Sequence, residues 1–394
     1  MRYLLEVNIN CCYDYRQNIG NTKTRRWGKW MEQHQRAYNF NAGPAALPLE
    51  VMERAQSEFI DFQGHGMSIM EMSHRGAVYE QVHNEAKQLL KELLHIPEGY
   101  DVLFLQGGAS LQFAMVPMNL LAEGKVGAYV HTGSWAGKAI KEAELIGDTR
   151  VITSTESDRF MRMPAPEEIV VPANAAYVHL TTNETIEGTQ FAAYPDTGTV
   201  PLIADMSSDI LCRPIDVSTF GMIYAGAQKN LGPSGVTVVI AKEELLANSP
   251  ATIPTMLRYS IHHENNSLHN TPSSFSIYMV NLVLQWLKQR GGLQQVERDN
   301  QAKAELLYDI IDNSGDFYCG CAARDSRSMM NVTFRIADEG LKKWFIKEAE
   351  EAGFVGLKGH RSVGGLRASI YNAVPYASCE ALAQFMKQFQ QKNG

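Results

Sequence analysis

The feature that most restricts the fold of this chain is a regular alternation, from Leu47 onward, of short apolar runs with segments of helical period. Val78, Val82, Ala86 and Leu89, for example, recur every three or four residues, as on the apolar face of a helix. The predicted strands are residues 101–105, 126–131, 177–180, 200–204, 222–225 and 236–240, and helices are predicted at 111–121 and 135–146. This alternation predicts an α/β fold with a mostly parallel sheet covered by helices.

A break in this pattern at Gly291 and Gly292, between two long helices, predicts a domain boundary. The 394 residues are enough for two domains. Residues 37–291 are expected to form a large domain, whose first segment is a candidate for packing on the small one. Residues 292–394 are expected to form a small α+β domain with strands at 330–334 and 365–370 and a helix at 340–352.

Residues 1–36 show neither a helical nor an alternating period, and we exclude this leader from fold reasoning. Three interpretations stay open. The leader is a translated upstream segment with the true start at Met31, a basic targeting arm, or a disordered natural tail.

Charge and cysteine content exclude several classes of protein. The chain has 36 Lys and Arg against 43 Asp and Glu, so its net charge of −7 does not favour nucleic-acid binding. The six cysteines show no CxxC spacing, which indicates a reducing compartment. No run approaches 18 apolar residues, and the N-terminal residues lack the apolar segment of a signal peptide. We therefore expect a cytoplasmic protein with no membrane segment.

Three positions combine turns, charges and strand ends. The turn at residues 107–110 (GGAS) joins a predicted strand to a helix, where backbone amides can bind an anion. Asp205 follows a predicted strand, at the edge where open α/β sheets bind ligands. Lys229 follows another strand among small residues, and enclosure suits a lysine to covalent catalysis. Each alone has an ordinary structural explanation: a tight turn, a helix cap, a surface lysine.

Together the three features are what pyridoxal phosphate requires: a phosphate cradle, a carboxylate for the ring nitrogen and a lysine for the aldehyde. Trp135 offers an aromatic face for the ring, although core packing would equally explain it. Neither a Walker loop nor a GxGxxG pattern is present in this turn, so nucleotide cofactors are less favoured.

Several longer motifs resemble the phosphoserine aminotransferase family, class V aminotransferases of the fold-type I pyridoxal-phosphate superfamily. They are residues 38–45 (YNFNAGPA), 70–76 (MEMSHRG), 183–188 (NETIEG), 218–233 (STFGMIYAGAQKNLGP), 270–272 (NTP) and 358–367 (KGHRSVGGLR). The resemblance runs from about Tyr38 to the C-terminus. It implies a fold-type I architecture, with a large domain and a smaller C-terminal domain.

The resemblance also implies a role for each matching residue. Lys229 would hold pyridoxal 5'-phosphate covalently and move the substrate proton, and Asp205 would pair with the ring nitrogen. The other implied cofactor residues are Ala109, Ser110, Trp135, Thr185 and Gln228, with Asn270 and Thr271 reaching the phosphate from the neighbouring subunit of a homodimer.

The implied substrate residues are cationic. Arg367 would bind the α-carboxylate, a task suited to a planar guanidinium. His360 and Arg361, with His74 and Arg75 of the partner subunit, would bind the substrate phosphate. Some family members have an arginine where this chain has Ser110. Either backbone and hydroxyl groups replace it here, or Arg75 and Arg361 carry more of the phosphate affinity.

The implied reaction transfers the amino group of glutamate to 3-phosphohydroxypyruvate, giving 3-phosphoserine and 2-oxoglutarate, and no metal is implied. Activity on the phosphorylated four-carbon analogue of pyridoxine biosynthesis stays open. The alternatives are another class V aminotransferase acting on alanine, serine or glyoxylate, a lyase using Cys319 or Cys321, and a binding protein that has lost the chemistry. The cationic residues argue against the first, and the presence of Lys229, Asp205 and Arg367 argues against the last.

Overall fold

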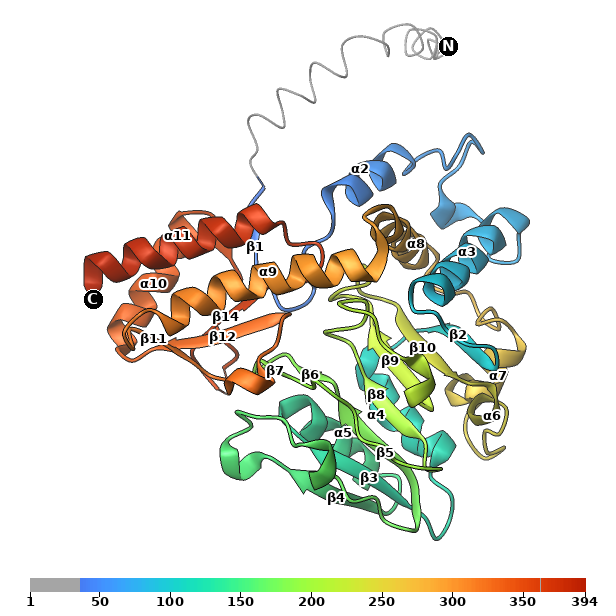
Figure 1. The fold of residues 1–394 in the computed structure, drawn as a ribbon. Helices are drawn as coiled ribbons and strands as arrows, with labels where there is room; N and C mark the ends of the chain where they lie inside the picture. The colour runs from blue at the N-terminus through green and yellow to red at the C-terminus, as the bar shows by residue number, and fades with distance from the viewer. Residues whose placement is uncertain (1–35, 362) are drawn as a thin grey trace, which may run out of the picture. The chain divides into compact units, whose positions relative to one another are not determined.

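A seven-stranded sheet forms the centre of the molecule in the computed structural model, which describes residues 36–361 and 363–394 (Figure 1). The strand order is β2-β10-β9-β8-β5-β3-β4. These strands are β2 (Tyr100–Leu105), β3 (Val126–His131), β4 (Thr149–Ser154), β5 (Ala175–Thr181), β8 (Leu202–Asp205), β9 (Met222–Gly226) and β10 (Thr237–Lys242). Only β10 runs antiparallel to its neighbours in this sheet. The predicted α/β fold with a mostly parallel sheet is confirmed.

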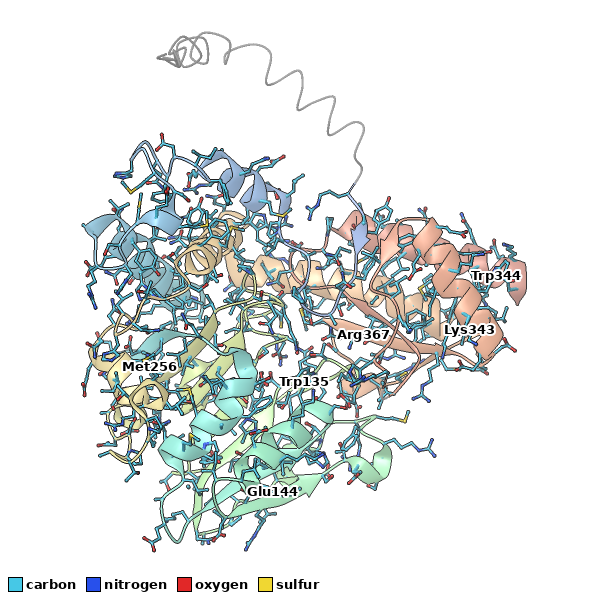
Figure 2. The ribbon with its side chains drawn as sticks, turned by 180° about the vertical axis from the view of Figure 1, so that it is seen from behind. Trp135, Glu144, Met256, Lys343, Trp344 and Arg367 are labelled. Carbon is cyan, nitrogen blue, oxygen red and sulfur yellow. The ribbon has the colours of Figure 1, made fainter. Side chains whose placement is uncertain are left out.

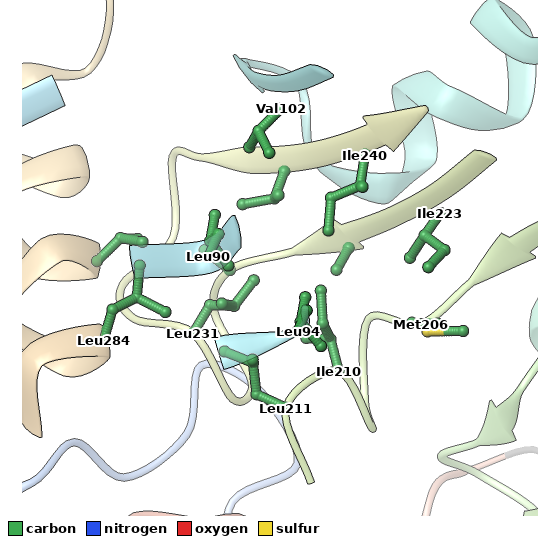
Figure 3. Packing of buried hydrophobic residues seen from close by; sticks show 14 of the residues in the cluster. Leu90, Leu94, Val102, Met206, Ile210, Leu211, Ile223, Leu231, Ile240 and Leu284 are labelled. Carbon is green, nitrogen blue, oxygen red and sulfur yellow. The ribbon is translucent and has the colours of Figure 1, made fainter. Parts of the chain in front are cut away.

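Helices cover both faces of this sheet. They are α2 (Leu49–Ser57), α3 (Ala77–Leu93), α4 (Gly108–Leu120), α5 (Ser134–Glu144), α6 (Glu243–Leu246), α7 (Tyr259–Glu264) and α8 (Ser274–Gln289). On one face, Leu90 of α3 and Leu284 of α8 share a core with Ile240 of the sheet (Figure 3). On the other face, Phe113 of α4 and Ile140 of α5 belong to a second core. Side chains of each strand alternate between the two cores, since neighbouring residues point to opposite faces.

A smaller antiparallel sheet lies in the C-terminal region, in the order β11-β12-β14. The elements here are α9 (Gly292–Asp312), β11 (Tyr318–Gly320), β12 (Asn331–Ile336), α10 (Glu339–Glu351), β13 (Phe354–Val355), β14 (Leu366–Ser369) and α11 (Tyr376–Asn393). Helix α9 packs on β11, β12 and α11. The strands and helix predicted for this region are confirmed, while the division into domains at residue 291 stays a prediction.

The segment after the short strand β1 (Tyr38–Asn39) connects this C-terminal region to the central sheet. The Phe40 amide donates to the Val355 carbonyl at 2.9 Å, and the Phe40 carbonyl accepts from the Ser369 amide at 3.2 Å. A few residues on, the Ala45 amide donates to the Gln228 carbonyl at 2.9 Å. Residues 40–45 therefore run from the small sheet to the end of β9, where Lys229 lies.

Several expectations concern other parts of the chain. The leader predicted at residues 1–36 lies almost wholly outside the described residues. Strand β4 was not predicted, because its residues lie at the sheet edge and are half-buried or exposed rather than apolar and buried. Within the described residues, no helix combines the length and apolar character needed to span a membrane.

Candidate active site

The carboxyl ends of β5, β8 and β9 meet at one edge of the central sheet, because these strands are parallel neighbours. Thr185 lies just after β5, in the hairpin of β6 (Asn183–Glu184) and β7 (Thr189–Gln190). Asp205 is the last residue of β8, and Lys229 follows β9. The topology thus brings together three residues that are far apart in the sequence.

Lys229 is held between the sheet edge and the N-terminal segment. Its Nζ donates to Thr185 Oγ1 at 2.7 Å. Gly43 lies so close that an added Cβ would be 3.1 Å from Lys229 Cγ, and its φ of 138° also favours glycine. Loss of hydration lowers the pKa of Lys229 to about 8, against the opposing effects of Asp205 and Glu184. A lysine in this state supplies a neutral amine close to neutral pH.

Asp205 is buried, with 4% of its surface exposed. Its Oδ1 accepts from the Ser207 amide at 2.9 Å and from Ser207 Oγ at 2.6 Å. Ser207 Oγ is itself fixed by the Gly226 amide at 3.0 Å. Burial raises the pKa of Asp205, although Ser207 and Lys229 oppose the shift. A protonated ring nitrogen beside this carboxylate would restore its charged form, because an opposite charge offsets desolvation.

Trp135, labelled in Figure 2, lies in the first turn of α5. Two lysine side chains approach its ring. Lys229 Nζ lies 5.1 Å from the ring centroid, and Lys138 Nζ lies 3.9 Å from it. Trp135 Nε1 is buried and has no hydrogen-bond partner among the described residues. The indole is therefore placed against the reactive lysine and retains an unused donor.

Two carboxylates fix the start of α5, and sequence reasoning assigned neither of them a role. Glu184 accepts from the Trp135 and Ala136 amides, both at 3.0 Å. Glu187 accepts from the Ser134 amide at 3.0 Å and from Ser134 Oγ at 2.6 Å. A Cβ on Gly133 would be 2.6 Å from Glu184 Cδ, so this close approach requires glycine. Burial raises the pKa of both carboxyls, and for Glu184 the repulsion from its neighbour adds to the rise.

The turn before α4 has the form expected of an anion cradle. Gly107 caps the helix in a left-handed conformation with φ of 92°, and no side chain caps the first amides. Ala109 is half-buried and Ser110 is exposed in the first turn. Gln228 is half-buried after β9. The role of this helix start in binding a phosphate stays a prediction.

Arg367 reaches the same sheet edge from β14 (Figure 2). Its Nη1 donates to the Thr185 carbonyl at 3.1 Å, and its Nε is buried with no partner among the described residues. Burial lowers the pKa of Arg367, with Glu187 opposing the shift. Thr185 thus touches Lys229 through its hydroxyl and Arg367 through its carbonyl.

The remaining predicted residues lie on loops. His360 is half-buried and Arg361 exposed in the turn before β14. His74 and Arg75 lie before α3, and within the described part of this single chain no hydrogen bond or ion pair joins them to Lys229 or Arg367. Asn270 is half-buried, and the Thr271 carbonyl accepts from Gln106 Nε2 at 3.4 Å. No three acidic, His or Cys side chains of the described residues converge as metal ligands.

Comparison with known proteins identifies the family. The family described as "Aminotransferase class-V" matches residues 37–382. Phosphoserine aminotransferase of Niallia circulans is 67% identical over 360 residues, which are 91% of this chain and 99% of the relative. The chain belongs to the phosphoserine aminotransferase family.

Solved structures agree with this membership. The phosphoserine aminotransferase of Bacillus circulans subsp. alkalophilus is 67% identical, superimposes with a TM-score of 0.91 and covers 92% of this chain and 100% of its own. The pyridoxal-phosphate-bound phosphoserine aminotransferase of Trichomonas vaginalis is 38% identical with a TM-score of 0.85, over 89% of this chain and 100% of its own. The fold-type I architecture predicted for this aminotransferase is confirmed.

Proposed function

We propose that this aminotransferase moves the amino group of glutamate to 3-phosphohydroxypyruvate, giving 3-phosphoserine and 2-oxoglutarate, with pyridoxal 5'-phosphate attached to Lys229. The observation that carries the proposal is the position of Lys229: its Nζ is bonded to Thr185, next to Trp135 and close to buried Asp205. Family membership and the bound cofactor in the Trichomonas vaginalis relative support it.

The residues of the site fit this cofactor. Trp135 offers an aromatic face with a spare donor, and Asp205 offers a carboxylate whose Oδ1 is already fixed by Ser207. The open amides at Ala109 and Ser110, with Gln228 nearby in the proposed site, suit a phosphate. When bound, pyridoxal phosphate carries the amino group between substrates and accepts the electrons of the substrate Cα–H bond.

Proton handling falls to two side chains. The Lys229 amine, once displaced by substrate, would take the proton from the substrate Cα and deliver it to the former aldehyde carbon of the cofactor, which its pKa near 8 allows. Asp205 would stabilise a proton on the ring nitrogen, because a cation beside a buried carboxylate offsets the desolvation that raises the pKa of Asp205. Thr185 Oγ1 keeps the Lys229 amine in position until substrate arrives.

Substrate recognition is assigned to the cations. Arg367 would bind the α-carboxylate common to both amino-acid substrates, since its guanidinium is rigid and its Nε is free for an acceptor. His360 and Arg361 would bind the substrate phosphate together with His74 and Arg75 of the partner subunit.

A homodimer with shared sites completes this proposal. Exposed apolar side chains lie close in sequence to His74 and Arg75: Ile60 is 82% exposed, Phe59 46% and Met70 45%. Large apolar side chains gathered on a surface are typical of an interface. Asn270 and Thr271 would reach the partner's cofactor phosphate. Mixing Lys229→Ala with Thr271→Ala subunits should then restore activity through one intact site per heterodimer, and no recovery after verified exchange would contradict it.

The alternatives receive less support. Cys319 and Cys321 line a cavity of about 180 Å³ beside Arg367. Burial raises the pKa of the Cys321 thiol, whereas a catalytic cysteine needs a lowered pKa. An unphosphorylated substrate would offer no phosphate group for Arg361 to bind. Activity on the four-carbon phosphorylated analogue and a cytoplasmic location belong to this proposal.

The decisive experiment adds the two substrates separately to the pyridoxal-phosphate enzyme. Glutamate alone should remove the absorption band near about 400 nm that arises from the lysine-bound cofactor. Phosphohydroxypyruvate should then restore it, whereas pyruvate and glyoxylate should restore it much more slowly. Equal rates for all three acceptors would contradict the proposed substrate.

A further inference from the structure

Lys138 is an exposed cation at the edge of the site that no part of the proposed mechanism uses. It lies one turn after Trp135 on α5, and its Nζ lies 3.9 Å from the centre of the Trp135 ring. Lys229 Nζ approaches the same ring at 5.1 Å. A single side chain thus separates the Lys138 ammonium from the reactive amine.

Lys138 is one of three cations that act on His360. Among the described residues, no carboxylate lies within ion-pair distance of its Nζ. Its positive charge acts on His360, as do those of Arg361 and Arg367, and together with burial they lower the pKa of that imidazole. A group of cations favours the binding of an anion, because the anion relieves the repulsion among them.

Lys138 is not needed to hold the indole. The amides of Ser134, Trp135 and Ala136 are already bound by Glu184 and Glu187, which fixes the start of α5. The Lys138 ammonium therefore adds positive charge beside the Trp135 ring but is not required to position that ring.

We propose that Lys138 is a further cation for the phosphoryl group of the substrate, contributed by the same subunit as Lys229. This inference rests on the proposed function and names one more residue of its substrate site. A flexible lysine can turn from the indole to a phosphate oxygen while remaining charged.

The test compares three variants of the pyridoxal-phosphate enzyme. Lys138→Gln removes the charge, Lys138→Arg keeps it, and Lys141→Gln is the matched control, an exposed lysine on the same helix. For Lys138→Gln we expect about a tenfold rise in KM for phosphohydroxypyruvate and in the inhibition constant of inorganic phosphate. kcat and the KM for glutamate should change less than threefold. Lys138→Arg and Lys141→Gln should stay within threefold of the unchanged enzyme.

Further readouts separate binding from a structural role. Lys138→Gln should leave the absorption band of the bound cofactor unchanged, and its defect should shrink at 0.5 M salt, because screening weakens an exposed charge contact. Equal losses for both substrates, an altered cofactor band or no loss of phosphate inhibition would overturn the proposal for Lys138. Failure of the proposed function would be seen separately, as an unchanged enzyme that does not prefer phosphohydroxypyruvate to pyruvate.

Discussion

The two ends of the site differ in how they are built. At the ring end, Asp205 and Thr185 are buried at strand ends and fixed by hydrogen bonds to Ser207 and Lys229. At the phosphate end, Arg361 is exposed on a loop and Lys138 lies on a helix surface, both without a carboxylate partner in the described structure. The difference teaches that the sheet preorganises the proposed reacting groups, whereas the proposed recognition groups would acquire their partner when an anion binds.

The largest effect should come from the ring end. Lys229→Ala should lower turnover with every substrate by at least about 1000-fold, because both attachment and proton transfer are lost. Steady-state rates with glutamate and phosphohydroxypyruvate measure this. Borohydride reduction followed by peptide mass spectrometry is the companion measurement, and cofactor fixed to a different lysine would show the assignment to be wrong.

Asp205→Asn tests whether the buried carboxylate acts electrostatically. The amide is isosteric but cannot keep a proton on the ring nitrogen, so kcat should fall about 100- to 1000-fold for both substrates. Circular dichroism and the dimer mass should stay unchanged. Turnover within threefold of normal would reduce Asp205 to a structural partner of Ser207.

Arg367 lies between the two ends, and its effect should be intermediate. Arg367→Lys removes the planar guanidinium, which can bind a carboxylate through two hydrogen bonds. Because glutamate and phosphohydroxypyruvate both carry an α-carboxylate, kcat/KM should fall about 10- to 100-fold for both. Arg335→Lys, an exposed position on neighbouring β12, is the matched control. A fall in kcat/KM for phosphohydroxypyruvate alone would indicate that Arg367 binds the substrate phosphate rather than the α-carboxylate.

Arg361→Ala should show the selectivity expected of the phosphate end. A charge-assisted contact contributes about 1.5–3 kcal/mol, and exposure reduces this, so a loss of roughly tenfold is expected in kcat/KM for phosphohydroxypyruvate. The glutamate half-reaction, followed by single-turnover absorption, should lose less. An equal fall in rate for both half-reactions would contradict a selective role of Arg361 in binding the substrate phosphate.

The smallest effect concerns pH. Because burial lowers the pKa of Lys229 to about 8, its amine is charged below that pH and neutral above it. The rate at which cofactor-free enzyme takes up pyridoxal phosphate covalently should rise about fivefold from pH 7 to pH 8 and level off above pH 9. Stopped-flow absorption measures the rate, and a rise that continues toward pH 10.5 would contradict the lowered pKa.

Sequence reasoning reached the fold and singled out the candidate residues Asp205 and Lys229, because both leave local signals. The buried strands are apolar runs, and Asp205 and Lys229 directly follow two of them. Strand β4, an exposed edge, and the reversed direction of β10 left no such signal, since strand direction depends on the connections between elements. The roles of Glu184 and Lys138 depend on where α5 begins relative to the β6–β7 hairpin, which is a tertiary relation. Two glutamates three residues apart, followed by Gly188, are the signal that could have indicated the role of Glu184.

Glu184 and Glu187, at the start of α5, also affect the orientation in which an anionic ligand can bind. Two helices, α4 and α5, begin near this sheet edge, and each would attract a negative group with its amino-terminal dipole. Glu184 and Glu187 occupy the amides of α5, whereas those of α4 are uncapped by side chains. One helix end is thus closed to phosphate and the other is open. For the proposed cofactor, which has one anionic end, this predicts a single favourable orientation, with its phosphate at α4 and its ring beside Trp135.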